Sequence, residues 1–388
     1  MNKTLLLIPG PVPVSAPVLE AMAWPMINHR GPEFAELLAR LERGMRPLFG
    51  TEKADVVFLG SSGTGGLEAA IANCFAPGDA LLACPVGVFG KRLIAIAKAF
   101  GCTVDVLETE PGSGLDAAAL AHKLKSDTER RYKGVLLTHN ETSTGVQNDM
   151  AAYAPALRAH GALTIVDSVS GLGASDFRMD EWGYDVVVTA SQKALAAPPG
   201  ISAVAISRRA WERIEGNDSS RFYFDLLKAR EFARKGQTPW TPPISIFYAL
   251  AVALERYHAE GMPGSWERHA RYAAAIRAAF EALNFRIFSA PGAHSVTVVA
   301  AVPPGGVEAA NLLAALRERY GVVLSGGQGD LAGKIVRFGT MGDVGENDVL
   351  GAIASIERAL ADVGAASSRG AGVAAAEESF AGLTAASV

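Results

Sequence analysis

Val186-Val-Val-Thr-Ala-Ser191-Gln192-Lys193-Ala-Leu-Ala-Ala-Pro198-Pro199-Gly200 is the stretch that decides the fold expected for this chain. A run of β-branched residues without a polar face predicts a buried strand over 185–189. Small and polar residues follow, then a single lysine, and the Pro-Pro-Gly turn prevents a long helix. A lysine directly after a buried strand either extends its amine to solvent or serves a ligand site. Lys193 is therefore the first candidate for a functional residue.

A second apolar strand, expected over 162–167, ends at Asp167, which lies 26 residues before Lys193. Two neighbouring strands thus each place one ionisable residue at the carboxyl edge of a sheet, where open α/β sheets bind ligands. A pyridoxal phosphate enzyme requires this pair. The lysine amine forms a Schiff base with the cofactor aldehyde, and the carboxylate keeps the pyridine nitrogen protonated.

Two further loops follow predicted strands and have the character of ligand-binding loops. After a strand over 56–59 comes Gly60-Ser61-Ser62-Gly63-Thr64-Gly65-Gly66 and then a helix over 67–75. Free N–H groups at such a helix start, together with hydroxyls and glycines, favour binding of a phosphate, although many such turns bind nothing. After a strand over 134–138 comes His139-Asn140-Glu141-Thr142-Ser143-Thr144-Gly145, a polar run that favours ligand contact. His139 itself is interpreted as a packed, hydrogen-bonded histidine.

Arg337 lies in the middle of the predicted strand 335–339. An arginine at such a position requires an anionic partner. That partner is either a structural carboxylate or the α-carboxylate of an amino acid, which a guanidinium binds in a bidentate manner.

The composition limits the function classes. The 388 residues are 49% hydrophobic and 20% charged, with a net charge of −4, so a sizeable core is expected and a basic surface for nucleic acid or membranes is not. The three cysteines have no metal-like spacing and are expected to be buried free thiols. No signal peptide or membrane span is predicted, and we expect a soluble, cytoplasmic protein.

Strands alternating with helices over 56–206 predict an α/β fold with a mainly parallel sheet. Four segments are expected: an extended N-terminal segment (1–20), a large domain (21–262), a smaller α+β C-terminal domain (263–363) and a disordered Ala/Gly/Ser-rich tail (364–388).

At these motifs the chain resembles a known family. Asp167-Ser-Val and Ser191-Gln192-Lys193-Ala-Leu-x-Ala-Pro-Pro-Gly resemble the cofactor signature of class V aminotransferases, and the closest branch is the alanine/serine–glyoxylate (serine–pyruvate) group. The resemblance runs from Pro9 to about Ala361. It implies the fold type I architecture, pyridoxal 5′-phosphate as cofactor, and a homodimer with shared active sites.

The resemblance also implies roles for individual residues. Ser62, Gly63 and Thr64 match the phosphate loop, Phe89 the aromatic ring that stacks on the pyridine, and Thr142 and Gln192 further cofactor contacts. Thr241 matches a residue that bonds the phosphate of the neighbouring subunit, and Arg337 the receptor of the substrate carboxylate. Gly10 allows close approach of the backbone at the substrate mouth.

Several of these positions keep an alternative interpretation. Phe89 is alternatively a core residue, and Gly10 is alternatively part of a rigid leader. Thr241, within Gly236-Gln-Thr-Pro-Trp-Thr-Pro-Pro243, is alternatively part of a helix start. Thr238 stands where the branch usually has tyrosine, which leaves phosphate contacts there in doubt. His29 and Arg30 either line the mouth or begin a solvated helix.

The function expected is transfer of an amino group from a small amino acid, alanine or serine, to glyoxylate or pyruvate, through a Schiff base on Lys193. The partners are then an amino acid and a 2-oxo acid. Alternatives are a class V enzyme with another donor, such as aspartate or aminoethylphosphonate, and a cofactor-binding protein without catalysis. A cysteine desulfurase is disfavoured because no cysteine lies in a mobile loop.

Overall fold

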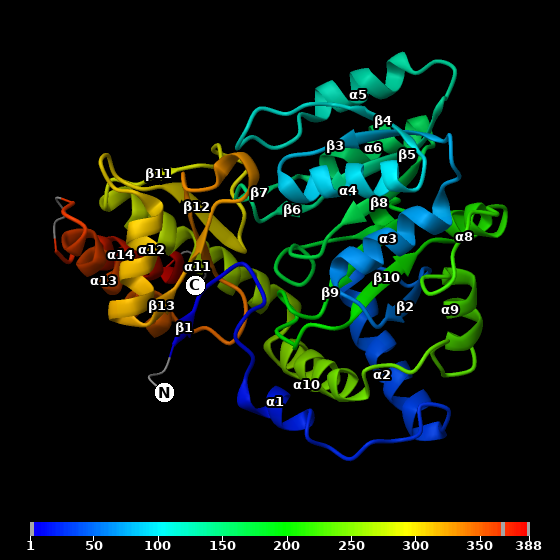
Figure 1. Cartoon of the computed structure of the whole chain (residues 1–388), viewed down its shortest axis with the longest axis horizontal. Coiled ribbons are helices and arrows are strands. Elements are labelled where there is room, and N and C mark those ends of the chain that lie inside the picture. Colours follow the sequence, from blue (N-terminus) through cyan, green and yellow to red (C-terminus); the bar gives the residue numbers. More distant parts are fainter. Residues whose placement is uncertain (1–3, 366–368, 386–388) are drawn as a thin grey trace.

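Two sheets, each covered by helices, organise the chain, as Figure 1 shows. The structure is a computed structural model that describes residues 4–365 and 369–385. The unit built on the larger sheet holds most of the blue to green elements of Figure 1, and the unit built on the smaller sheet holds the yellow to red ones together with the dark blue N-terminal strand.

The larger sheet has seven strands in the order β2-β10-β9-β8-β5-β3-β4. Neighbours from β9 to β4 pair in parallel, whereas β10 runs antiparallel to both β9 and β2. The prediction of a mainly parallel sheet is therefore confirmed. The strands are β2 (Asp55–Leu59), β3 (Ala80–Cys84), β4 (Thr103–Val106), β5 (Tyr132–Thr138), β8 (Leu163–Asp167), β9 (Val186–Ala190) and β10 (Ser202–Ile206).

Both faces of this sheet are buried, and the strand sequences show why. In β9, Val187 packs into the core on one face, while Val186 and Val188 pack into the core on the other. Because side chains alternate along a strand, a strand covered on both faces must be apolar throughout. One face carries α2 (Pro32–Phe49), α5 (Ala117–Ser126), α6 (Met150–His160) and α10 (Ile244–Glu260), and the other α3 (Gly63–Cys74), α4 (Val88–Ala99), α8 (Arg208–Glu215) and α9 (Leu226–Ala233).

The smaller sheet is antiparallel, with the order β11-β12-β15-β14. Its strands are β11 (Arg286–Ile287), β12 (Val298–Val302), β14 (Ser325–Gly326) and β15 (Val336–Gly339). Its core is shared with α11 (Met262–Ala282), α12 (Ala309–Tyr320) and α13 (Glu346–Asp362). The N-terminal segment joins this unit, because β1 (Leu5–Leu6) pairs in parallel with β13 (Val322–Val323) and Leu7 is buried in the same core.

Four further elements are short. They are α1 (Ala16–Ala21), the hairpin strands β6 (Asn140–Glu141) and β7 (Val146–Gln147), and α7 (Met179–Trp182). A 3₁₀ turn spans Gly329–Leu331. Among the described residues, no helix combines the length and the apolar character that a membrane crossing requires.

The prediction of a disordered tail over 364–388 is wrong for its larger part. Residues 371–385 form helix α14 (Ala371–Ala385), and Ala376 and Phe380 are buried in the core of the smaller unit. The carboxylate of Glu357 on α13 accepts hydrogen bonds from the N–H groups of Gly370, Gly372 and Val373 at the start of this segment. Small residues suit this close packing, and their composition alone resembles that of a disordered segment. Positions 366–368 and 386–388 lie outside the described residues.

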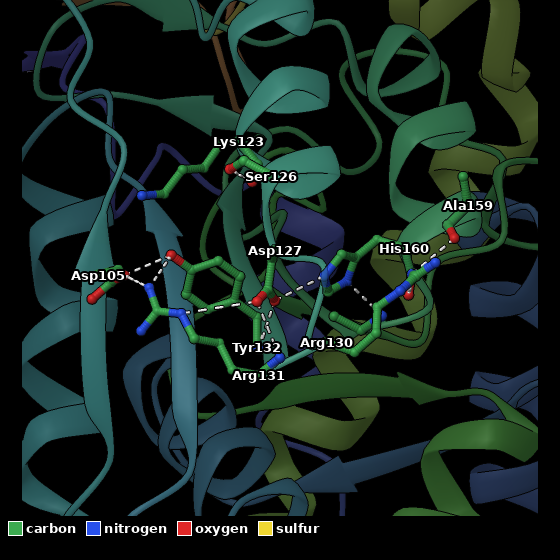
Figure 2. A network of polar contacts seen from close by, with 10 residues as sticks. Asp105, Lys123, Ser126, Asp127, Arg130, Arg131, Tyr132, Ala159 and His160 are labelled. Carbon is green, nitrogen blue, oxygen red and sulfur yellow. Dashed lines mark hydrogen bonds and ion pairs between the residues drawn. The ribbon is translucent and has the colours of Figure 1, made fainter.

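A partly buried polar network holds the amino-terminal end of β5, at the edge of the sheet opposite the loops that follow β5, β8 and β9 (Figure 2). The carboxylate of Asp127 accepts hydrogen bonds from the N–H groups of Arg131 and Tyr132, and it contacts His160 Nε2 at 3.1 Å. The Tyr132 hydroxyl donates to Asp105 at 2.6 Å. The network therefore joins the end of α5, the start of β5 and the end of α6.

Candidate active site

A cavity of about 260 Å³ lies at the carboxyl ends of the parallel strands. It brings together nearly all residues that the sequence singled out. The predicted site residues that line it are Gly10, Ser62, Gly63, Thr64, Phe89, Thr142, Asp167, Gln192 and Lys193. Two predicted residues, Arg337 and Thr241, do not line it.

Lys193 lies in the turn that follows β9, and its amine is held at the cavity wall. Nζ donates a hydrogen bond to the carbonyl oxygen of Pro9 at 2.7 Å. Burial lowers the pKa of this amine from 10.5 to about 8, with further lowering by the charges of Arg337 and Arg92 and an opposing effect of Asp167. A neutral amine is therefore accessible near neutral pH, which is the form that adds to a carbonyl group.

Asp167 ends β8, the strand next to β9, and is 4% exposed. One carboxylate oxygen accepts a hydrogen bond from the N–H of Val169 at 3.0 Å. The pKa of Asp167 is raised to about 6, mainly by burial and further by the charge of Glu141. The Val169 N–H and the charges of Lys193 and Arg92 oppose the rise. A cationic partner in the cavity would stabilise the ionised carboxylate.

The start of α3 forms a cradle of backbone N–H groups. Ser62 is the N-cap residue, and its side chain makes no capping hydrogen bond, so its hydroxyl is available to a ligand. Gly63 packs closely on the loop after β8, since a Cβ atom there would lie 2.7 Å from Val169 Cγ2. The helix start and its free hydroxyl are suited to an anion.

Arg92 is a cavity residue that the sequence reasoning missed. Its guanidinium carbon lies 4.7 Å from the centroid of the Phe89 ring, and Nη1 donates to Thr64 Oγ1 at 3.2 Å. Its spacing from Phe89 could have identified it in the sequence, because a residue three positions after Phe89 on a helix lies on the same face. Arg92 adds a positive charge beside the α3 cradle.

Gln192 Oε1 is buried at the cavity and has no hydrogen-bond partner among the described residues. Buried acceptors of this kind normally have a donor, so a ligand with a donor or a bridging polar group suits this place. Thr142 also lines the cavity, and its backbone oxygen accepts a hydrogen bond from Arg337 Nη1 at 2.9 Å.

Arg337 lies in β15 and is 5% exposed, as its place in the middle of a strand predicted. Besides Thr142, its guanidinium contacts the carbonyl oxygen of Gly326 at 2.8 Å through Nε. Burial lowers its pKa, and Glu141 opposes this effect. Arg337 is thus adjacent to the cavity, behind Thr142.

Three further candidates have clear positions. Thr241 is exposed and lies outside this cavity. Arg30 binds the loop that precedes Thr241, with Nη1 donating to the carbonyl oxygen of Thr238 at 2.6 Å and Nη2 to that of Pro239 at 3.1 Å. The packed interpretation of His139 is confirmed. Its Nδ1 lies 2.8 Å from Ser168 Oγ, and burial lowers its pKa to about 4.

A larger cavity of about 380 Å³ lies on the other side of the turn after Lys193, lined by Leu195, Tyr257 and Asp343 among others. Among the residues that the structure describes, its lining includes no lysine and no cysteine that could act as a nucleophile, so the smaller cavity is the better candidate. The described part of the chain contains no cluster of three or more His, Cys, Asp or Glu side chains suited to a metal ion.

Comparison with known proteins agrees with this geometry. The model of the aminotransferase class V family matches residues 19–338. The chain belongs to the class V aminotransferases.

Relatives along almost the whole chain carry different names. The chain is 41% identical to the soluble hydrogenase small subunit of Synechococcus sp. over 97% of its length and 98% of that protein. It is 38% identical to L-aspartate–glyoxylate aminotransferase of Paracoccus denitrificans (98% and 97% covered) and 36% identical to serine–glyoxylate aminotransferase of Arabidopsis thaliana (96% and 94% covered). The solved structure of ureidoglycine–glyoxylate aminotransferase from Bacillus subtilis superimposes with a TM-score of 0.92 at 29% identity, covering 98% of this chain and 99% of that one.

Proposed function

We propose that this protein is a pyridoxal 5′-phosphate-dependent transaminase that moves the amino group of a small amino acid to glyoxylate. The observation that carries the proposal is the pairing, in one cavity, of an amine of lowered pKa on Lys193 with the buried carboxylate of Asp167. Relatives named for glyoxylate support the acceptor.

The residues present fit this cofactor. The N–H groups at the start of α3 and the Ser62 hydroxyl suit its phosphate, and the Phe89 ring supplies an apolar face beside them. Gln192 Oε1, which lacks a partner, suits a donor on the ligand. Asp167 suits the protonated ring nitrogen.

When bound, pyridoxal 5′-phosphate supplies an aldehyde that combines with amines and a ring that accepts the electron pair of the substrate Cα–H bond. The Lys193 amine would hold the cofactor through its aldehyde, and a free Lys193 Nζ would accept the Cα proton of the substrate and return it. The carboxylate of Asp167 would keep the ring nitrogen of the bound cofactor protonated. The guanidinium of Arg337 would bind the substrate carboxylate. To do so, it would give up one of its hydrogen bonds to a backbone carbonyl oxygen.

Lys193→Ala tests this assignment. With pyridoxal 5′-phosphate added, the variant should show no visible absorbance band of lysine-bound cofactor, and amino transfer from alanine or serine to glyoxylate should fall by at least about 10³-fold. The matched control is Lys133→Ala, which removes an exposed lysine of β5 and should change neither. Turnover of Lys193→Ala at the wild-type rate would disprove the role of Lys193, and a wild-type protein that binds cofactor without turnover would favour a non-catalytic binding protein.

An aspartate donor is the second candidate. The Paracoccus relative is named for it, and Arg92 places a cation in the cavity to which a second carboxylate could bind. Single-turnover spectra with alanine, serine and aspartate, followed by glyoxylate and pyruvate, would rank the donors and acceptors. A faster half-reaction with aspartate, lost in Arg92→Gln, would establish this alternative.

We also propose a homodimer in which Thr241 reaches the phosphate in the partner's cavity. Thr241 is exposed, and two large exposed aromatic side chains, Phe222 (72%) and Tyr223 (49%), lie beside it and stack on Trp240. Exposed apolar patches of this kind mark interaction sites. Mixing Lys193→Ala with Thr241→Glu tests the proposal, because only a mixed dimer rebuilds one intact site. Activity no higher than the sum of the separate variants would contradict it.

A further inference from the structure

Glu141 is a buried carboxylate that none of the roles above uses. It is fully buried and lies in β6, between Asn140 and Thr142, both of which line the cavity. A buried carboxylate is stable only when donors surround it. The donors that surround Glu141 show which segment of the chain its carboxylate holds in place.

The carboxylate is surrounded by four hydrogen-bond donors. Oε2 accepts from the N–H groups of Phe89 at 3.0 Å and Gly90 at 3.1 Å. Oε1 accepts from the N–H and the hydroxyl of Ser143 at 3.1 and 2.6 Å. The Ser143 hydroxyl oxygen in turn accepts from the N–H of Val88 at 2.9 Å. The first turn of α4 is therefore bonded to Glu141 directly and through Ser143.

The backbone permits this contact because of Gly87, the residue before α4. A Cβ atom on Gly87 would lie 2.5 Å from Glu141 Cγ and 2.5 Å from Ser143 Oγ. The helix start thus rests directly on the carboxylate, where the positive end of the helix dipole adds to the attraction.

This first turn carries Phe89, and the next residue on the same face is Arg92; both line the cavity. On the other side of Glu141, the Thr142 carbonyl oxygen binds Arg337. Moving the first turn of α4 would therefore shift the ring and the cation that face the ligand, without removing either.

We propose that Glu141 is a positioning residue, which sets the place of Phe89 and so the affinity and orientation of the bound cofactor. This inference rests on the proposed function, since it takes the cavity to bind pyridoxal 5′-phosphate.

Glu141→Gln is the informative change because it keeps the size and removes the charge. All four neighbours of the carboxylate are donors, so the amide NH₂ of glutamine must face donors in either orientation. The helix start must then shift or lose hydrogen bonds to a charged acceptor, the kind that contributes most.

The matched control is Glu357→Gln. Glu357 is also a buried glutamate that accepts hydrogen bonds from the N–H groups at a helix start, but it does so in the smaller unit. Both variants should lose stability. Only Glu141→Gln should raise the dissociation constant of pyridoxal 5′-phosphate, by about tenfold, and weaken the visible circular dichroism band of the bound cofactor.

A double-mutant cycle with Phe89→Ala separates positioning from a general loss of structure. If Glu141 acts through Phe89, Glu141→Gln should change cofactor affinity by less than about twofold in the Phe89→Ala background. An equal loss of affinity in both backgrounds, or a Glu141→Gln protein with wild-type affinity and circular dichroism, would overturn the inference.

Ser143→Ala provides a milder second variant in case Glu141→Gln does not fold. It leaves three donors on the carboxylate and removes the acceptor of the Val88 N–H. We expect the same spectral change with a smaller amplitude, and a loss of cofactor affinity of about threefold. Unchanged affinity and an unchanged spectrum would again contradict the proposal. A wild-type protein that shows no cofactor band at all would instead disprove the proposed function.

Discussion

Gly10 and Lys193 are in direct contact, and a Cβ atom placed on Gly10 would lie 2.6 Å from Lys193 Nζ. The Gly10 backbone also has φ +131, which L-residues rarely adopt. Gly10→Ala should therefore either displace the lysine amine or strain the backbone. Either effect should cost about 1–3 kcal/mol of free energy. We expect the affinity for the cofactor, followed by its absorbance band, to fall by about ten- to a hundredfold.

The control for Gly10 is Gly351→Ala. Gly351 lies inside α13, and an added Cβ would have no atom within 4 Å. This change should leave the cofactor band intact and raise stability slightly, since alanine favours a helix over glycine. A Gly10→Ala protein that attaches cofactor as the wild type does would show that the contact is dispensable.

The lowered pKa of Lys193 predicts how cofactor attachment depends on pH. Because only the neutral amine adds to an aldehyde, the rate constant for attachment should rise with pH and level off above about 8, rather than near 10.5. Asp167 raises this pKa, so Asp167→Asn should shift the midpoint to lower pH. Arg92 lowers it, so Arg92→Gln should shift the midpoint to higher pH. Stopped-flow absorbance across pH 6–10 measures these shifts, and shifts of the opposite sign would contradict the electrostatic assignment.

Helix α14 should contribute to stability but not to catalysis. Phe380 packs in the core of the smaller unit and stacks edge-on against Tyr272 at 6.0 Å. Phe380→Ala should lower the free energy of unfolding by about 3 kcal/mol through loss of buried area and formation of a cavity. Urea denaturation measures the effect, with the exposed Glu377→Ala as control, which should stay within about 0.5 kcal/mol. Equal stabilities would mean that α14 does not dock.

The Asp127 network should make stability depend on acid pH. Burial opposes ionisation of Asp127, but the N–H groups of Tyr132 and Arg131 and the contact with His160 outweigh it and hold its pKa below 3.8. A carboxyl group whose pKa is lowered by folding stabilises the protein at pH values above its pKa in the unfolded state. This contribution is lost as the pH falls through its pKa in the folded state. Asp127→Asn should therefore destabilise by about 1–3 kcal/mol at pH 7 and by progressively less below pH 3.8. A loss that is constant across this range would contradict an ionic role.

Much of the fold and the candidate site follows from local sequence. Runs of apolar residues that end at Asp167 or shortly before Lys193 predict buried strands, and parallel strands place their carboxyl ends at one edge. The convergence of these two residues with Ser62–Thr64 and Thr142 is therefore predictable from the sequence. The tail could not, because an Ala-rich segment is equally compatible with disorder and with close packing on α11 and α13.

The sequence by itself determined the strand ends, and with them which ionisable side chains face the cavity. Only the tertiary structure decided how the cavity walls are held. Glu141 obtains its donors from residues 89, 90 and 143, and Arg30 obtains its acceptors from residues 237–239. The reason is physical: a strand end depends on neighbours along the chain, whereas a buried charge depends on whichever donors folding brings to it.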